Sequence, residues 1–580
     1  MLRKAWRQWM DDLVKRHYFC QACEAVVSNP GQKDFSCPHC TAENSGKNFF
    51  VTLDLKKQIE VMLFDKAVSK GLMDSLKRRQ SETHDGIIKD ISDGRLYKEQ
   101  MNDSSWCDIS LTFNTDGAKV FKSNRASIWP VQCVVNELPL SLRWGNVLLC
   151  GLYFGKGHPK MSSFLGTFVQ SIKELNCVRW RCDEQSLSSK VHITCCCVDA
   201  PARAAVLNMK QYNGYYGCSF CLHSGVHIHG SLRYPVQQQG RQPELRTDKS
   251  VREDMQASVL SGNPSHGIKG SSALAHLPKF DLVQSVCPDY MHCVLEGVAR
   301  QLADIWFGAV NSSSYIGMPA QVKTVDERLL CIKPPQWFTR LPRSIQERAM
   351  WKASEWKWWV LFYGDPCLDD ILPSNYHNHF CLLVSAIHLL LKDSITREDI
   401  SDAMGKLSDF LFKIQKLYGE ASMNFNVHQL LHLPRSVVEL GPLWAHSTFL
   451  FESENGVLLK LISSANGVAV QVLERFVMQL RLVMLRNTLD LQPQVKEMCQ
   501  QLISPAPSKV PETRTLGRGI VCGIVGHEQK SAFIAELGFI PDAVTSYQRI
   551  VVRGHLLHTT EYQRAKRTRN CTFKCTEGQF

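Results

Sequence analysis

An aspartate and a pair of cysteines are the first residues whose types and spacing suggest chemistry. Asp199 follows an apolar, cysteine-rich run over 191–198 that has the character of a buried strand. Strand ends are where α/β folds place reacting groups. After an alanine-rich helical segment that starts near Pro201, the chain reaches Cys218 and Cys221, whose spacing suits a metal ion. The aspartate and the cysteine pair predict a single site, and the remaining residues of that site must come from elsewhere in the chain.

Two more cysteine pairs near the N-terminus have the spacing of a zinc site. Thirteen residues separate the pair Cys20 and Cys23 from the pair Cys37 and Cys40. Four thiolates on two such turns can surround Zn²⁺ tetrahedrally. We therefore expect a zinc ribbon over 1–45. A ribbon of this kind is structural or contacts nucleic acid or protein, so it identifies no reaction.

The elements that must position Asp199 are predicted from hydrophobic alternation upstream. Residues 108–115 alternate as a half-buried strand does and end at Asp116-Gly117, a pair typical of a hairpin turn. Before the strand of Asp199 come two more β-like runs and an amphipathic helix, over 128–137, 146–154 and 162–175. A hairpin, a further strand, a helix and an acid-tipped strand is the order of an RNase H-like core. In that fold the first two acids lie on adjacent strand ends.

The order of these motifs resembles the DDE transposases of the CACTA (En/Spm) type, in the CMC superfamily. The similarity covers roughly residues 105–490 and rests on NTDG at 114–117, VDAPAR at 198–203, YNG at 212–214, GCSFC at 217–221, DYMHCVLEG at 289–297, WKASEW at 351–356, NVHQLLHL at 426–433 and FESENG at 451–456. The arrangement is also similar to the catalytic core of the recombination-activating recombinase and its Transib relatives.

The resemblance implies an α/β (α+β) fold, with an RNase H-like DDE catalytic core interrupted by a mostly α-helical insertion, in addition to the zinc ribbon. It also implies that Asp116, Asp199 and Glu452 are the catalytic carboxylates. Such oxygen ligands can hold two Mg²⁺ (or Mn²⁺) ions about 4 Å apart, which activate the attacking oxygen and stabilise the leaving 3′ oxygen. Glu454 is the competing third acid. At helical spacing the two glutamates point in different directions, and periodicity does not choose between them.

In the recombinase relatives, a cysteine pair after the second acid and a histidine pair before the third bind one zinc ion. His428 and His432 stand four residues apart in a Leu-rich helical segment, so both imidazoles project from one face. Alone, such a pair is more typical of core packing. Beside the otherwise partnerless Cys218 and Cys221, it predicts a Cys₂His₂ zinc site. That zinc would fasten the region of the second acid to the helix leading to the third.

More than 200 residues separate the second acid from the third, too many for a loop in a compact fold. Residues 232–280 are rich in Gln, Gly, Ser and Pro and are expected to be flexible, whereas apolar periodicity from 286 onward predicts helices. Asp289 and His292 match an acid-x-x-His element of related transposases and are secondary site candidates. The alternative is an aspartate at a helix N-terminus beside a packed histidine.

Composition bears on partners and compartment. The net charge of +12 favours acidic partners such as DNA without proving one, and the 23 cysteines without a secretory signal argue for reduced thiols, some of them binding metal. No apolar run reaches the roughly 20 residues of a membrane span. We therefore expect a nuclear protein without a membrane segment that binds DNA at transposon ends and target. A homo-oligomer is expected because paired ends must be joined.

The expected domains follow one another along the chain. They are a zinc ribbon (1–45), a helical linker (46–104), the first part of the core (105–231), the insertion (232–425), the last part of the core with the third acid (426–490), and a β-leaning C-terminal region (491–580) with a basic tail at 564–569. The predicted function is metal-dependent cleavage of DNA phosphodiesters and strand transfer by a DDE transposase. The alternative is a domesticated, non-catalytic derivative that binds DNA or chromatin. Intact acids favour the enzyme but do not show that this copy is active.

Overall fold

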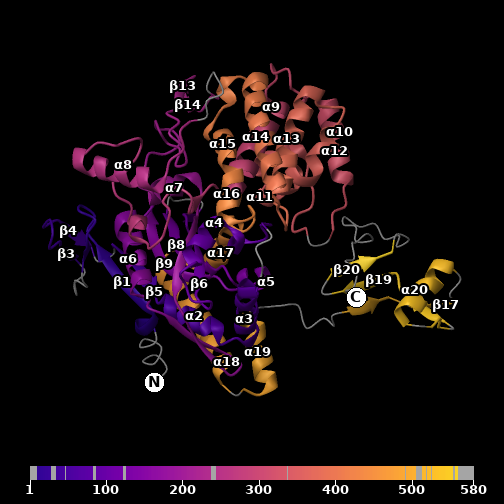
Figure 1. The fold of residues 1–580 in the computed structure, drawn as a ribbon, viewed down its shortest axis with the longest axis horizontal. Helices are drawn as coiled ribbons and strands as arrows, with labels where there is room; N and C mark the ends of the chain where they lie inside the picture. Colours follow the sequence, from indigo (N-terminus) through magenta and orange to yellow (C-terminus); the bar gives the residue numbers. More distant parts are fainter. Residues whose placement is uncertain are drawn as a thin grey trace. The chain divides into compact units, whose positions relative to one another are not determined.

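The computed structural model describes residues 10–559 apart from 28–33, 46–47, 82–85, 122–125, 237–242, 336–337, 490, 504–512, 518, 524–525, 538, 542 and 553–554. Figure 1 shows the ribbon coloured along the sequence, and the contacts within the chain divide it into two compact units. The first takes residues 1–304 and 372–499, and the second takes 305–371 and 500–580. Every residue singled out above as a site candidate belongs to the first unit.

The first unit is built on a mixed β-sheet that has nine strands among the described residues. In spatial order these are β15 (Val286–Cys287), β12 (Val191–Cys197), β6 (Ile109–Thr115), β8 (Ala126–Val135), β9 (Leu148–Lys156), β5 (Phe49–Leu53), β1 (Val14–Phe19) and β2 (Val26–Val27), with β7 (Ala118–Lys119) also paired to β8. β6, β12 and β15 are parallel, and the remaining neighbours are antiparallel. The C-terminal ends of β6 and β12 therefore lie at the same edge.

The central strands are covered on both faces. The sequence of β12 is a nearly continuous apolar run, as suits such a strand, whereas β6 alternates apolar and polar residues and buries both sets, so the half-buried strand expected over 108–115 is wrong. All seven residues of β6 are buried, as are six of the seven in β12. Helix α6 (Met161–Glu174) packs on the sheet through Phe164 and Phe168, whose rings lie 5.3 Å from Phe50 and 5.2 Å from Phe113. The predicted strand over 191–198 and helix over 162–175 are both confirmed to within one residue.

The hairpin turn predicted at Asp116-Gly117 is wrong. β6 and β7 both pair with β8, with Thr115 opposite Val131 and Ala118 opposite Ile128. The Asp-Gly pair is therefore a break between two segments that share one partner strand. An Asp-Gly pair suits such a break as well as it suits a tight turn. Gly117 also lies close to Trp129, because a Cβ at this position would lie 2.7 Å from the Trp129 ring.

The segments expected to form a separate ribbon and a linker contribute to the core of the first unit. β1 pairs with β5, and β5 pairs with β9, so the first cysteine pair lies at the edge of the main sheet. Helices α2 (Leu55–Leu63) and α3 (Lys66–Ser81) follow. Gln58 of α2 is fully buried and bonds both backbone groups of Leu149, at 2.9 and 3.1 Å. Leu72 and Leu76 of α3 are also fully buried.

Helices dominate the stretch between the second and third acids. The helices from there on that lie wholly or mostly in the first unit, besides the short η2 (Ala273–His276) and η6 (Glu420–Ser422), are α7 (Ala200–Val206), α8 (Asp248–Ser261), the π-helix η3 (Met291–Ala299), α9 (Arg300–Gly308), α13 (Ser374–Leu390), α14 (Arg397–Tyr418), α15 (Phe425–Gln429), η7 (Leu430–His432), α16 (Leu433–Leu440), α17 (Phe449–Lys460), α18 (Val468–Thr488) and α19 (Pro493–Ile503). The flexibility expected for 232–280 is wrong for the part that forms α8, because Thr247 and Ser250 make a capping box that starts this helix.

The second unit contains two groups of elements. One is helical and consists of α10 (Pro319–Cys331), η4 (Ile345–Met350), α11 (Ala353–Trp358), the π-helix η5 (Trp359–Tyr363) and α12 (Gly364–Leu368). The other is the C-terminal group β16 (Thr513–Leu516), β17 (Ile520–Cys522), α20 (His527–Leu537), β18 (Val544–Ser546), β19 (Arg549–Val552) and β20 (His555–His558). The basic tail at 564–569 lies outside the described residues. Among the described helices, none has the length and apolar character that crossing a membrane requires.

Candidate functional site

Asp116 and Asp199 follow the ends of two adjacent parallel strands. Asp116 comes directly after β6, and Asp199 comes two residues after the end of β12. Asp199 is also the N-cap of α7, where its carboxylate accepts a 2.7 Å hydrogen bond from the Ala202 N–H. Both aspartates are partly exposed. The topology of the sheet therefore brings the first two predicted acids to one edge.

Glu452 comes to the same place from α17, in the first turn of that helix. Burial raises the pKa of Asp116 to about 8, and the negative charges of Asp199 and Glu452 add to this rise. Partial desolvation also raises the pKa of Asp199 and of Glu452, which is the most exposed of the three. The three carboxylates thus lie close enough for their charges to act on one another.

The competing acid, Glu454, has different surroundings. Burial alone raises the pKa of Glu454, whereas the pKa of Glu452 also responds to Asp199, Asp289 and His292. The two glutamates lie two positions apart on α17, so their side chains leave the helix in different directions. Of the two glutamates, Glu452 is therefore the one whose charge interacts with those of Asp116 and Asp199.

Asp289 is a buried hub that links this group to α17. Its Oδ1 accepts a 3.0 Å bond from the Thr448 N–H, and its Oδ2 accepts bonds from Thr448 Oγ1 (2.7 Å) and from His292 Nδ1 (2.8 Å). Thr448 is the residue from which α17 starts. Asp289, from the loop after β15, thus holds both His292 and the beginning of the helix that carries Glu452.

His292 is the positive partner of the carboxylates. Burial alone would lower the pKa of His292, but the hydrogen bond that its Nδ1 donates to Asp289 and the charges of Asp289, Asp199 and Asp116 raise it to about 10. The same interaction holds the pKa of Asp289 below its usual value in spite of burial. The neighbouring carboxylates therefore favour the protonated form of His292.

Buried polar side chains lie at the same end of β6 as Asp116. The Asn114 Nδ2 donates a 2.7 Å bond to the Cys197 carbonyl and so fastens the end of β6 to the end of β12. Gln132 of β8 pairs across the ladder from Asn114. Among the described residues, the Asn114 Oδ1 and both side-chain polar atoms of Gln132 are buried without a hydrogen-bond partner. Such atoms are typical of a site that holds ordered water.

The four residues of the predicted Cys₂His₂ site come together in the interior of the first unit. Cys218, Cys221, His428 and His432 are all buried, and their ligand atoms lie within 4.8 Å of one another. The Cys218 Sγ is 3.5 Å from His432 Nε2, and the Cys221 Sγ is 3.3 Å from His428 Nε2. Sulfur and nitrogen bound to one tetrahedral zinc would be about 3.5 Å apart. This group could therefore hold a metal ion.

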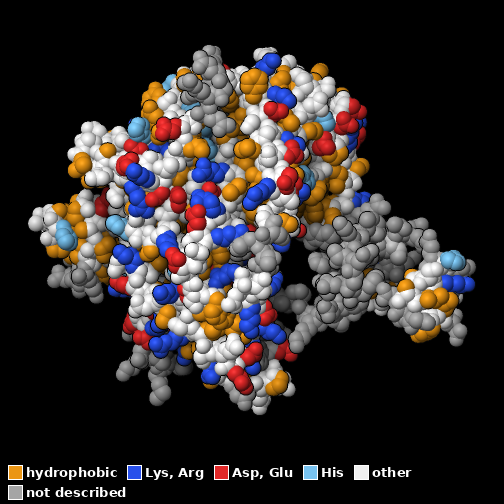
Figure 2. All heavy atoms as spheres, viewed as in Figure 1, with side chains coloured by type: hydrophobic (Ala, Val, Ile, Leu, Met, Phe, Trp, Pro, Cys, Tyr) orange, Lys and Arg blue, Asp and Glu red, His pale blue; other side chains and the backbone are white. Residues whose placement is uncertain are grey.

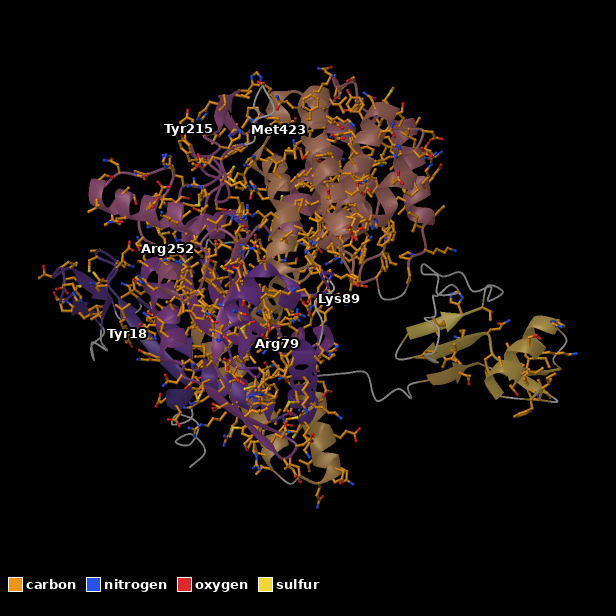
Figure 3. The ribbon with its side chains drawn as sticks, viewed as in Figure 1. Tyr18, Arg79, Lys89, Tyr215, Arg252 and Met423 are labelled. Carbon is orange, nitrogen blue, oxygen red and sulfur yellow. The ribbon has the colours of Figure 1, made fainter. Side chains whose placement is uncertain are left out.

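The surroundings of this group connect it to the helix of Asp199. Arg203, buried on α7, donates a 2.7 Å bond to Gln429 Oε1, and Gln429 Nε2 lies 3.4 Å from Cys218 Sγ. Arg246 is buried as well and donates to the carbonyls of Cys218 and Cys221, at 3.0 and 3.3 Å. Tyr215 and Met423, which come shortly before the Cys and His pairs in sequence, are labelled in Figure 3. The cluster and α7 thus share one hydrogen-bond network.

The N-terminal cysteines form a second group, as predicted. Cys20 Sγ is 3.6 Å from Cys40 Sγ, and Cys23 Sγ is 3.6 Å from Cys37 Sγ. Sulfurs about 2.3 Å from a tetrahedral zinc would be about 3.8 Å apart. Each pair is followed by a residue in the left-handed region, at Glu24 and Thr41, with φ of 63° and 61°. The second pair lies on the hairpin of β3 (Asp34–Ser36) and β4 (Glu43–Ser45), and the four thiols could hold a zinc ion.

No protein-family model and no curated protein matches this chain.

Three contributors to the site were missed in the sequence. Thr448 carried a usable signal, because a threonine before the helical run FLFES is a typical helix start. Arg203 also carried one, since it is a lone charge within an alanine-rich helix. Gln429 carried none, because a polar residue beside His428 in a helix is ordinarily solvent-facing. Its burial depends on Arg203, which is 226 positions away in sequence.

Proposed function

We propose that this protein is a DDE transposase with an RNase H-like core, which cleaves DNA phosphodiesters and joins the liberated 3′ end to a target. The observation that carries the proposal is that Asp116 and Asp199 follow the ends of adjacent parallel strands, with Glu452 near enough for its charge to raise the pKa of Asp116. Acids whose pKa values are raised by burial and by one another's charges are concentrated at functional sites.

The strand order supports the fold assignment within this proposal. Antiparallel β9, β8 and β6, followed by parallel β12 and β15, place the first two acids on adjacent strand ends. That is the arrangement expected of an RNase H-like core. The helical segments between β15 and α17 would then be the insertion of such a transposase.

The donor set fits divalent metal ions. Asp116, Asp199 and Glu452 offer hard carboxylate oxygens, which are the ligands that Mg²⁺ and Mn²⁺ prefer. When bound, such ions would activate the attacking water or 3′ hydroxyl and stabilise the leaving oxygen. His292, held by Asp289, would balance part of the carboxylate charge and orient a phosphate beside it.

The zinc sites would have mechanical roles. A zinc ion on Cys218, Cys221, His428 and His432 would fix α7, which Asp199 caps, to the helical segment that leads toward Glu452. A second zinc ion on the N-terminal cysteines would stabilise the edge of the sheet. Neither group offers an open position in its set of four protein ligands, which is typical of structural zinc.

DNA, a second copy of the chain and the nucleus complete the proposal. The net charge of +12 suits a polyanionic partner, and Figure 2 shows Lys and Arg side chains spread over the visible face among acidic ones. Two transposon ends must be held together for joining, so an oligomer of this chain is expected to act on them.

The test is a nicking assay on DNA that carries candidate terminal repeats, with Mg²⁺ or Mn²⁺. The parent protein should produce nicks that leave 3′ hydroxyl ends, and Asp199→Ala should bind the same DNA without cutting it. A parent protein that binds DNA but never cuts, with binding unchanged in Asp199→Ala, would favour a domesticated, non-catalytic DNA-binding protein.

A further inference from the structure

A polar pocket lies in the first unit, and none of its described lining residues belongs to either of the two candidate zinc sites. Its volume is about 550 Å³, which falls within the range of small-molecule sites. The walls come from the last turns of α3, from residues 86–93, from α4 (Arg95–Met101) and from residues 136–143. Arg79 and Lys89, which line it, are both labelled in Figure 3.

Among the described residues, five basic and three acidic side chains line the pocket. The basic ones are Arg78, Arg79, Lys89, Lys98 and Arg143, and the acidic ones are Asp90, Asp93 and Glu137. Hydroxyl groups of serines and of Tyr97 add hydrogen-bonding capacity to the walls. Excess positive charge with several hydroxyl groups is the lining that suits a phosphate.

The acidic side chains are already engaged within the walls. Asp90 accepts two bonds from Arg143, at 3.0 and 2.7 Å. Glu137 is buried and accepts the Tyr97 hydroxyl at 2.8 Å and the Ser110 N–H at 2.9 Å. These acids therefore hold the wall in place, and they leave the pocket's excess of positive charge for a ligand.

Two of the arginines are likewise part of the wall. Arg79 donates to the Tyr97 hydroxyl at 2.6 Å and to the Asp108 carbonyl at 3.3 Å. Arg143 is buried and donates to the Leu138 carbonyl as well as to Asp90. Arg78 and Lys98 are at least partly exposed, and Arg78 donates a 3.0 Å bond to the hydroxyl of Ser75, which also lines the pocket. These two side chains can turn their charged groups toward a ligand at little cost.

The pocket is distinct from the carboxylate site. Glu137 bonds the backbone of Ser110 near the start of β6, whereas Asp116 follows the end of that strand. Six residues of extended strand, at about 3.3 Å each, separate the two levels by about 20 Å. A ligand in the pocket would therefore not touch the three acids.

We propose that this pocket binds a phosphate group carried by a nucleotide-sized ligand, with Arg78 and Lys98 contacting the phosphate and the fixed wall of Arg79, Tyr97 and Glu137 forming the floor. The phosphate could belong to a free nucleotide or to the end of a nucleic-acid strand, which share this chemistry. The proposal does not rest on the proposed transposase activity.

The experiment is isothermal titration of the full chain, without added divalent ions, with pyrophosphate, ATP, and a single-stranded oligonucleotide with or without a 5′ phosphate. Arg78→Ala/Lys98→Ala should weaken binding at least about tenfold, because two charge-assisted contacts are lost. The control is Lys70→Ala/Lys77→Ala, which removes the same charge from exposed positions of α3 outside the pocket. Binding by the control should stay within about twofold of the parent.

The outcomes separate the two phosphate sources and decide the proposal. A selective loss of ATP binding assigns a free nucleotide, and a selective loss for the 5′-phosphorylated oligonucleotide assigns a strand end. Equal affinities in the pocket and control variants, or no binding of any of these probes by the parent, would overturn the proposal. Lys98→Glu, a single inversion of charge, gives the same reading if the double variant melts early in circular dichroism.

Discussion

At the scale of single residues, the carboxylate group shows what sequence can and cannot predict. Asp116 and Asp199 were predictable because each follows a run with clear strand character, and parallel neighbours end at one edge. Glu452 was assigned only by resemblance, since helical periodicity could not choose between it and Glu454. The choice depends on the direction in which α17 presents each side chain, which is set by contacts far away in sequence.

The choice of Glu452 leads to a matched pair of substitutions. If Glu452 is the third metal-binding acid, Glu452→Gln should reduce metal-dependent DNA nicking by at least about 100-fold, because one ligand charge at the reacting centre is lost. Glu454→Gln changes the same charge two residues away and should keep the rate within about threefold. The measurement is the initial nicking rate at saturating Mn²⁺. Equal losses in both variants would remove Glu452 from its assigned role.

The hub at Asp289 predicts graded losses of stability. Thr448→Val removes the hydroxyl bond to Asp289 but keeps the backbone bond, and should lower the free energy of unfolding by about 1 kcal/mol. Asp289→Ala removes every acceptor and leaves His292 without its partner, so it should cost about 3 kcal/mol or more. Urea unfolding of both variants measures the difference. A Thr448→Val loss as large as that of Asp289→Ala would contradict this account of the hub.

At the scale of elements, the predictable parts were those whose local pattern is strong. Strand β12 and helix α6 follow directly from an apolar run and from amphipathic spacing. Helix α8 was missed because the Gln, Gly, Ser and Pro of its surroundings masked the capping box at Thr247 and Ser250. The position of β1 and β5 in the main sheet was missed because pairing between distant strands leaves no local signal.

The two groups of four ligands predict a metal content. The purified protein should hold about two zinc ions per chain, because each of these groups offers four thiolate or imidazole ligands in a closed set. Cys37→Ser should lower this content to about one by loss of the N-terminal ion, and His432→Ala should do so by loss of the core ion. Elemental analysis of the dialysed protein measures the content. Two ions retained in either variant would show that the altered group is not a zinc site.

The core ion should matter more for stability than the N-terminal one. His432→Ala removes a buried ligand that contacts Cys218 and Phe220, so we expect a larger fall in melting temperature than for Cys37→Ser at the sheet edge. Ser464→Ala, at an exposed turn, is a control that should leave the zinc content and the melting temperature unchanged. The order of the two losses, measured by calorimetry, tests the clamp role directly.

The pairing of α13 with α14 predicts a dependence on pH. His379 is buried, stacks on Phe410 at 4.1 Å, and is 3.0 Å from the Phe410 carbonyl through Nε2. Burial lowers the pKa of His379 to about 4, and the charge of Lys413 adds to the effect. The unfolded chain, with a histidine pKa near 6.5, then binds more protons than the folded one below pH 6.5. Stability is therefore lost as the pH falls from 6.5 toward 4.

The size of this loss is bounded by the shift, at up to about 3 kcal/mol. His379→Gln keeps a donor for the Phe410 carbonyl but does not titrate, so its stability should fall less between pH 6.5 and 4.5 than that of the parent. Urea unfolding at both pH values gives the difference. Parallel losses in parent and variant would show that His379 does not contribute to the acid sensitivity.

At the scale of the whole molecule, the candidate site joins segments that are far apart in the chain. Asp116, Asp199, Asp289 and Glu452 span more than 300 residues, and Asp289 bonds Thr448 across 159 positions. Local sequence patterns could not predict that these distant segments meet, because their meeting depends on the order of strands in one sheet. A ligand that binds to several of these segments at once should therefore stabilise the whole first unit.

The meeting of these segments leads to a prediction about metal binding. A divalent ion held by the three carboxylates would tie β6, β12 and α17 together, so added Mn²⁺ should raise the melting temperature of the parent by a few degrees at about 100 times its dissociation constant. The shift should grow from pH 6 to pH 8, because a proton on Asp116, whose pKa is about 8, competes with the ion at lower pH. Asp116→Asn should abolish the shift, whereas Glu454→Gln should retain it. Two results would mean that the three acids do not share an ion: a parent melting temperature that Mn²⁺ does not change, or an equal shift in Asp116→Asn. The segments that carry the acids have no other reason to respond together to a divalent cation.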